Sequence, residues 1–144
     1  MALIFKYAHV PRKDGSLRQA PYLPIYAKNR FGQTMRILAL IDSGADSTVI
    51  PKDLAMLLGL GGKEYGKTGG IGGEVKVKYS RFRFNVIGNR ERYSLDVPAL
   101  ILDQENSDVP LLLGRHGFFE NFHITFRQNE EKIILKRIQP KRLF

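Results

Sequence analysis

The sequence predicts an all-β, barrel-like domain with one or two short helices. Two observations carry this prediction. Short apolar or alternating runs recur along the chain and are separated by segments rich in glycine, asparagine and proline. Helix-forming signals are confined to two short segments. At 144 residues, 43% of them hydrophobic, the chain is expected to form a single domain over residues 1–144 with its own core.

The N-terminal part of the chain combines an arm with two strands. Pro11 and the turn-forming sequence from Asp14 to Ser16 predict an irregular leading arm over residues 1–20. Residues 22–27 and 35–41 are apolar and strand-like, and a polar, turn-rich connector separates them. We therefore expect the regular part of the domain to begin near residue 21.

The second half of the chain is predicted to form strands almost throughout. Residues 75–79 alternate apolar and basic side chains, as a half-exposed strand does. A closing hairpin is expected near the end, so that residues 127–144 are an extension made of one strand and a tail. The other predicted strands are 81–87, 92–97, 99–102, 110–113, 122–126 and 132–138.

Helix signals occur at residues 51–59 and 115–121. In the first segment Pro51 suits the start of a helix, Asp53 suits its first turn and Gly59 suits its end. The second segment is predicted to be a further short helix. Between residues 59 and 73 the chain carries most of its 14 glycines.

Composition excludes several function classes. The sequence has no cysteine, which excludes disulfides, thiolate zinc sites and a cysteine nucleophile. The histidines, at positions 9, 116 and 123, form no metal-like cluster, so we expect neither metal nor cofactor.

Apolar runs are too short to span a bilayer, and no signal peptide is recognisable at the N-terminus, so a cytoplasmic location is expected. The net charge of +9 is dispersed, and its densest stretch, from Lys132 to Arg142, fits a solvated strand and tail better than a nucleic-acid site.

The local feature that points to chemistry is Asp42-Ser43-Gly44. A strongly apolar strand ends directly in this aspartate, which places its carboxylate beside low-dielectric surroundings where acid–base chemistry can be tuned. Taken alone, the tripeptide is also typical of an ordinary β-turn. The flanks favour the functional interpretation, because an apolar run resumes at residues 48–50.

Residues 39–50 resemble the active-site loop of retropepsins, the retroviral-type aspartic proteases. Residues 69–73 resemble the flap tip of that family, and residues 111–115, Leu-Leu-Leu-Gly-Arg, resemble its Gly-Arg signature near the C-terminal helix. The three segments occur in the family's order and span about residues 21–126. The resemblance implies a closed β-barrel-like acid protease fold. The additional strand after residue 126 makes the chain more similar to cellular or prokaryotic members than to the short retroviral enzymes.

The resemblance implies catalysis by Asp42 with Ser43 and Gly44. This chemistry needs two carboxylates that share one proton. The sequence contains one such motif, since neither Asp96 nor Asp103 precedes a glycine loop. The second carboxylate must then come from a second copy, which predicts a C2 homodimer that cleaves peptide or protein substrates.

Further site residues follow from the resemblance. Ala45, Asp46 and Leu112 are expected to bind substrate together with the flap residues Gly69, Gly70, Ile71 and Gly72. Asp46 and Arg115 are expected to form an ion pair that ties the active-site loop to the C-terminal helix, the alternative being two unrelated surface charges. Val109, Ile50 and Leu40 are either walls of the cleft or core residues.

Two rival functions remain open at this point. The first is a non-catalytic dimeric module of the same fold that binds extended peptides by strand addition. The intact Asp42-Ser43-Gly44 argues against it. The second is a basic nucleic-acid-binding domain, for which the sequence offers no aromatic and basic stacking platform.

Overall fold

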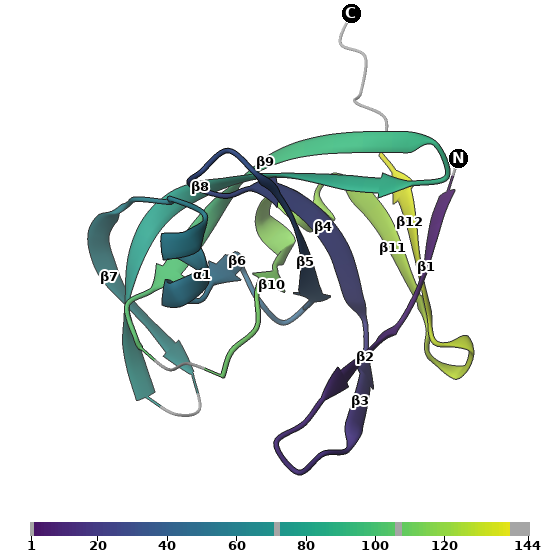
Figure 1. Ribbon diagram of the computed structural model, residues 1–144, viewed down its shortest axis with the longest axis horizontal. Coiled ribbons are helices and arrows are strands. Elements are labelled where there is room, and N and C mark those ends of the chain that lie inside the picture. The colour runs from purple at the N-terminus through teal and green to yellow at the C-terminus, as the bar shows by residue number, and fades with distance from the viewer. Residues whose placement is uncertain (1, 71–72, 106–107, 139–144) are drawn as a thin grey trace, which may run out of the picture.

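A computed structural model describes residues 2–70, 73–105 and 108–138. Within these residues twelve strands form three sheets, of seven, three and two strands (Figure 1). The prediction of an all-β domain with few short helices is confirmed. No helix among the described residues is long and apolar enough to cross a lipid bilayer.

The seven-stranded sheet curls on itself. A pairing of Tyr26 with Asn85 joins its two halves, so the sheet is barrel-like rather than flat. Its strand order is β4 (Tyr22–Lys28), β5 (Thr34–Ile41), β10 (Leu112–Leu113), β6 (Thr48–Ile50), β9 (Glu91–Leu102), β8 (Gly73–Gly88) and β7 (Lys63–Gly70).

Strands β8 and β9 form one long antiparallel ribbon, visible along the top of Figure 1. The sequence predicted four shorter strands here, because Ser80 and Pro98 look like strand ends. Both residues instead lie within the ladder, with Ser80 opposite Ala99 and Pro98 opposite Arg81. Asn89 and Arg90 turn the ribbon at positive φ, 46° and 67°, as a tight hairpin requires.

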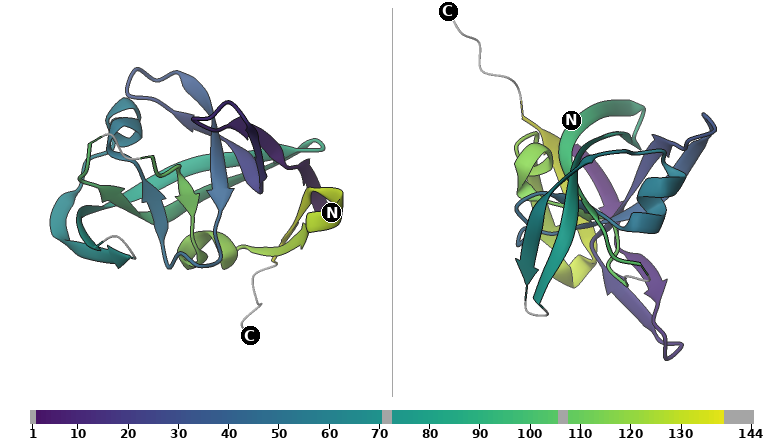
Figure 2. Two further views of the ribbon diagram at one scale, coloured as in Figure 1. Left: turned by 90° about the horizontal axis from the view of Figure 1, so that it is seen from below. Right: turned by 90° about the vertical axis from the view of Figure 1, so that its left-hand side faces the viewer.

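The predicted irregular arm at residues 1–20 is wrong. This segment contains β1 (Ala2–Lys6) and a hairpin of β2 (Ala8–Pro11) and β3 (Leu17–Ala20). Strand β1 pairs with β12 (Lys132–Arg137), which also pairs with β11 (Phe122–Arg127). A partner so distant in sequence leaves no local signal, which is why the sequence pattern did not reveal β1. The β2–β3 hairpin projects from the body of the molecule (Figures 1 and 2).

The helical segments are shorter than predicted. Helix α1 (Lys52–Leu57) begins after Pro51, and Gly59 ends the segment at φ +68°. The second helix is reduced to a distorted turn, η1 (Arg115–Phe119), because His116 is extended and Gly117 has φ +91°. A side chain at Gly117 would also approach Val97 within 2.8 Å. A turn, η2 (Gln128–Glu130), joins β11 to β12.

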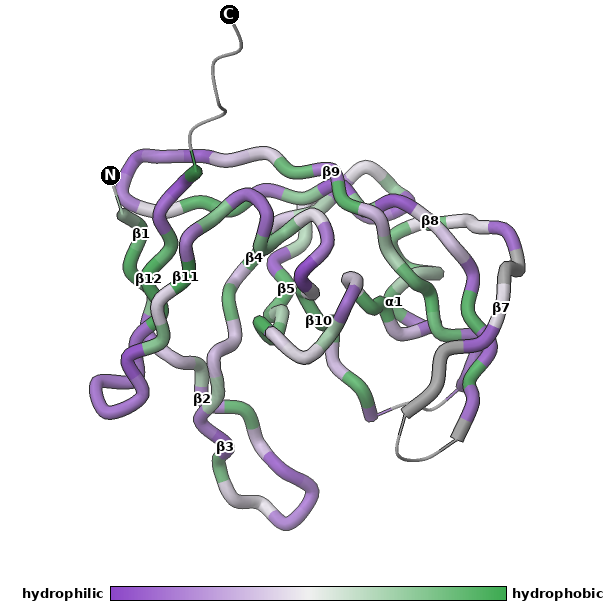
Figure 3. The backbone as a smooth tube through the Cα atoms, turned by 180° about the vertical axis from the view of Figure 1, so that it is seen from behind, coloured by the Kyte–Doolittle hydropathy of each residue, from purple (hydrophilic) through white to green (hydrophobic). Residues whose placement is uncertain are grey.

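The core lies between the β8–β9 ribbon, β4 and η1. Phe82 and Phe84 stack with ring centroids 5.0 Å apart, and Phe118 packs against both Phe84 and Phe122. Hydrophobic segments lie along the strands, whereas the turn between β11 and β12 is hydrophilic (Figure 3). Ala39 and Ile41 of β5 and Leu113 of β10 belong to this core, and these two strands position the candidate site.

Candidate active site

Asp42 directly follows β5, and the short strand β10 holds it in place. The Asp42 N–H donates to the carbonyl of Leu113 at 3.1 Å, and the Leu40 N–H donates to that of Leu111 at 2.8 Å. Strand β10 runs parallel to β5 and antiparallel to β6, so Leu112 lies between Leu40 and Val49. The loop over residues 42–47 is therefore anchored at both of its ends by the same two-residue strand.

Within the loop, backbone amides orient the Asp42 side chain. The Gly44 N–H donates to Asp42 Oδ1 at 2.9 Å, and the Ala45 N–H donates to the Asp42 carbonyl at 3.2 Å. Asp42 is half-buried, whereas Ser43 and Gly44 are exposed. A Cβ at Gly44 would lie 3.2 Å from the same Oδ1, so glycine leaves the carboxylate uncrowded. The result is a fixed carboxylate at the surface of a loop.

Arg115 contacts this loop through both its side chain and its backbone. Its Nη1 donates to the Ser43 carbonyl at 2.6 Å, and its Nη2 donates to Asp46 Oδ1. Its N–H donates to the Ala45 carbonyl at 2.9 Å, and the His116 N–H donates to the Asp46 carbonyl at 2.8 Å. The predicted Asp46–Arg115 ion pair is thus present. Both side chains are exposed, so the pair contributes little Coulomb energy and serves mainly to orient the loop.

Gly114 allows this close approach. A Cβ at Gly114 would lie 2.3 Å from the Ser47 carbonyl oxygen and 2.8 Å from the Ser47 nitrogen. Both atoms belong to the backbone, so they cannot move aside as a flexible side chain would. Only glycine lets the turn at residues 114–116 rest on the active-site loop.

A cleft of about 510 Å³ lies beside the loop. Ala45 and Asp46, predicted as substrate-binding residues, line it on the loop side. Gly66 and Lys67 of β7 and Tyr79 of β8 also line it. The β7–β8 hairpin that carries the predicted flap therefore borders the same cleft as the active-site loop.

The other predicted residues are only partly placed. Gly69 and Gly70 end β7, whereas Ile71 and Gly72 lie outside the described residues. Leu112 is half-buried within β10 and does not line this cleft. Ile50 is fully buried, so it is a core residue rather than a cleft wall.

Sequence reasoning missed several lining residues. Lys67, Tyr79 and Leu100 border the cleft although none belongs to a family motif. The alternation at residues 75–79 did predict a strand with one solvent-facing side, but the sequence does not reveal which cleft that side meets.

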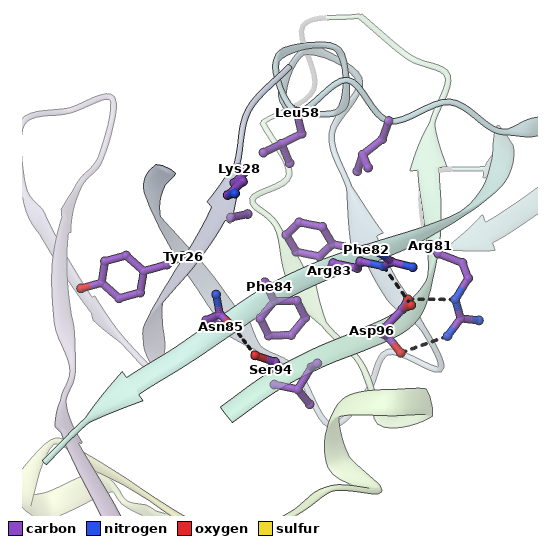
Figure 4. A pocket seen from close by; sticks show the side chains of 13 residues that line it. Tyr26, Lys28, Leu58, Arg81, Phe82, Arg83, Phe84, Asn85, Ser94 and Asp96 are labelled. Carbon is purple, nitrogen blue, oxygen red and sulfur yellow. Dashed lines mark hydrogen bonds and ion pairs between the residues drawn. The ribbon is translucent and has the colours of Figure 1, made fainter. Parts of the chain in front are cut away.

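A second hollow, of about 640 Å³, lies between β4, β8 and the end of α1 (Figure 4). Its floor includes Phe82 and Phe84, and Asp42 lines neither this hollow nor the cleft beside the loop. Its one carboxylate, Asp96, accepts hydrogen bonds from Arg81 Nε at 2.9 Å and Arg83 Nε at 3.2 Å. Chiefly the hydrogen bond from Arg81 holds the pKa of Asp96 below its usual value. A neutralised ion-pair group offers no acid–base chemistry, so this hollow is the weaker candidate.

Comparison with known proteins identifies the family to which the chain belongs. A family model described as aspartyl protease matches residues 27–116, which are 90 of the 144 residues and include both Asp42 and Arg115. The chain belongs to the aspartyl protease family. No curated protein matches the sequence of this aspartyl protease.

Solved structures show which fold this aspartyl protease shares. A retropepsin-like aspartic protease from Rickettsia conorii matches with a TM-score of 0.61 and 21% identity, covering 94% of this chain and 98% of the other. The EIAV protease, solved with the inhibitor HBY-793, matches with a TM-score of 0.47 and 19% identity, covering 74% and 88% of the two chains. The aspartyl protease therefore has the retropepsin-like fold that the sequence resemblance implied.

Proposed function

We propose that this aspartyl protease is a homodimeric endopeptidase whose active site contains two Asp42 side chains, one from each subunit. The observation that carries the proposal is the fixed, surface-facing carboxylate of Asp42 in a loop anchored by β10 and Arg115. One such loop supplies half of the pair that the chemistry requires. A two-fold axis beside the loop would bring the second half into place.

Two other carboxylates, Asp46 and Asp14, are poor substitutes for a second Asp42. Asp46 belongs to the same loop but is paired with Arg115. Asp14 accepts hydrogen bonds from the Ser16 side chain and N–H in the projecting hairpin, and the side-chain bond is the larger cause of its lowered pKa. Neither of these two carboxylates can therefore take the place of a second Asp42.

The two aspartates would share one proton, so that one acts as the general base and the other as the general acid. The ionised carboxylate accepts a proton from a water molecule, whose oxygen attacks the scissile carbonyl carbon. The protonated carboxyl donates its proton to the carbonyl oxygen, which gives a tetrahedral diol. Proton transfer to the amide nitrogen then lets the C–N bond break, and the two carboxyls again share one proton.

The β7–β8 hairpin would act as the flap. It borders the same cleft as Ala45 and Asp46, and by resemblance its tip is the glycine-rich segment 69–73. Glycines there would let backbone amides approach an extended peptide. Substrate would thus lie between the flap and the loop.

The test is cleavage of a mixed peptide library by wild type and by Asp42→Asn. Wild type should generate new peptide termini, detected by mass spectrometry, and the variant should be slower on the order of a thousandfold or more because it lacks the shared proton. Asp53→Asn, an exposed acid in the first turn of α1, is the matched control and should cleave normally. Sedimentation should show dimers in all three cases. Equal cleavage by wild type and Asp42→Asn would contradict the proposal, and absence of cleavage by wild type would favour the non-catalytic peptide-binding module.

A further inference from the structure

The sheet formed by β1, β12 and β11 has one face in the core and one face in solvent. Leu3, Ile133 and Leu135 point inward and are almost completely buried. The residues that alternate with them face outward, because successive side chains of a strand point to opposite faces. This outer face lies at the end of the molecule opposite to β7, which borders the cleft (Figure 1).

The register of the sheet places cations directly opposite one another on the outer face. Lys6 is opposite Lys132, and Lys132 is opposite Arg127, so three cations form one row across three strands. Four residues further along β12, Lys136 lies opposite Ala2 and His123. Side chains opposed in this way have Cβ atoms about 5 Å apart, and like charges there are destabilising.

These cations are poorly compensated within the described part of the chain. Arg127 pairs with Glu130 at 3.4 Å in the η2 turn. Lys6, Lys132 and Lys136 have no carboxylate within ion-pair distance among the described residues. An anionic partner would offset the repulsion within the row, so the outer face is complementary to a negatively charged surface.

An apolar centre separates the cationic row from Lys136. Ile4, 56% exposed, lies opposite the half-buried Ile134, which lies opposite Thr125. Nucleic acid would use the cations but not this centre, and among the described residues the outer face offers one ring, the imidazole of His123, rather than a row of aromatic side chains on which successive bases could stack. Cations that surround an exposed aliphatic side chain instead suit a membrane surface, where charge meets headgroups and the apolar group enters the headgroup–acyl boundary.

We propose that the outer face of the β1–β12–β11 sheet binds an anionic lipid surface through Lys6, Lys132, Arg127 and Lys136, with Ile4 inserted among the headgroups. Strand β7, which borders the cleft, would then lie at the end of the molecule away from the lipid (Figure 1). The proposal is independent of protease activity, so the Asp42→Asn variant should bind lipid as wild type does.

The experiment is co-sedimentation of the full chain with phosphatidylcholine vesicles that contain or lack phosphatidylserine. The test variant carries Lys6→Gln, Lys132→Gln and Lys136→Gln. The matched control removes the same charge from exposed residues of β4, β5 and β9, through Lys28→Gln, Arg36→Gln and Arg92→Gln. Wild type and the control should bind vesicles that contain phosphatidylserine, whereas the test variant should bind them more weakly by roughly fivefold per lysine and on the order of a hundredfold in all.

A second variant, Ile4→Ser, keeps every charge and tests the apolar centre. It should bind phosphatidylserine vesicles roughly tenfold more weakly than wild type if Ile4 enters the membrane. Equal losses in the two triple variants would overturn the proposal, because non-specific attraction by the net charge would then suffice. Binding of wild type to a single-stranded oligonucleotide in preference to vesicles, with no effect of Ile4→Ser, would overturn the lipid assignment in favour of nucleic acid.

Discussion

At the scale of single residues, Arg115 does more than balance the charge of Asp46. Its guanidinium donates to the Ser43 carbonyl with one nitrogen and to Asp46 with the other, and its own N–H donates to Ala45. The planar fork of arginine suits two acceptors at once. Ser43 and Ala45 flank Gly44, whose amide orients the Asp42 carboxylate, so Arg115 is a positioning residue.

This arrangement predicts that Arg115→Lys is not a conservative change. A lysine ammonium can pair with Asp46 but cannot at the same time reproduce the arginine fork at Ser43. Amide hydrogen exchange in residues 43–46 should therefore become faster in Arg115→Lys, and kcat for peptide cleavage should fall by tenfold or more, on the order seen when supporting residues allow a site to shift. Arg12→Lys, in the exposed hairpin, is the control and should change neither quantity. Unchanged exchange in Arg115→Lys would show that the backbone contacts alone hold the loop.

The Asp42–Arg115 constellation could be predicted from the sequence because each part is carried by a short local motif. Asp42-Ser43-Gly44 and Leu113-Gly114-Arg115 are recognisable without knowledge of the fold. Lys67 and Tyr79 could not be predicted as cleft residues, because their place depends on the β7–β8 hairpin and the loop lining the same cleft. A position that arises from the packing of distant strands leaves no local pattern.

At the scale of elements, the same reasoning separates the predicted strands from the missed ones. Strands β4 and β5 were predictable because both are apolar and lie close together in sequence, so their pairing is local. Strand β1 was not, because its partner β12 lies at the other end of the chain. Its role is structural, since Leu3 is completely buried against the core.

The two faces of β1 give a matched pair of predictions. Leu3→Ala should lower the free energy of unfolding by about 2–5 kcal/mol, because it leaves a cavity in the core. Ile4→Ala, one residue further on and 56% exposed, should change it by less than about 1 kcal/mol. Urea unfolding of both variants measures the difference. Equal and small effects would mean that β1 contributes little to the core and behaves as the irregular arm that the sequence predicted.

At the scale of the whole molecule, the fold gives one anchored loop and one cleft beside it. The β10 strand, the Gly114–Arg115 turn and the core all fix a single carboxylate, and the proposed reaction needs two. Activity then becomes a property of the assembly, and an inactive subunit should inactivate its partner. This consequence distinguishes a shared site from two independent ones.

Mixing wild type with Asp42→Asn tests directly whether an inactive subunit inactivates its partner. If the two proteins are unfolded together and refolded at concentrations where dimers prevail, subunits pair at random, and a heterodimer holds one carboxylate where the reaction needs two. At a constant amount of wild type, cleavage should fall to about half with an equal amount of the variant and to about one fifth with a fourfold excess, from random pairing in a two-fold dimer. Adding Asp53→Asn in place of Asp42→Asn should raise cleavage instead, because that variant keeps the catalytic acid. Cleavage that stays constant as Asp42→Asn is added would show that each subunit works alone, and the second carboxylate would then have to come from within the chain.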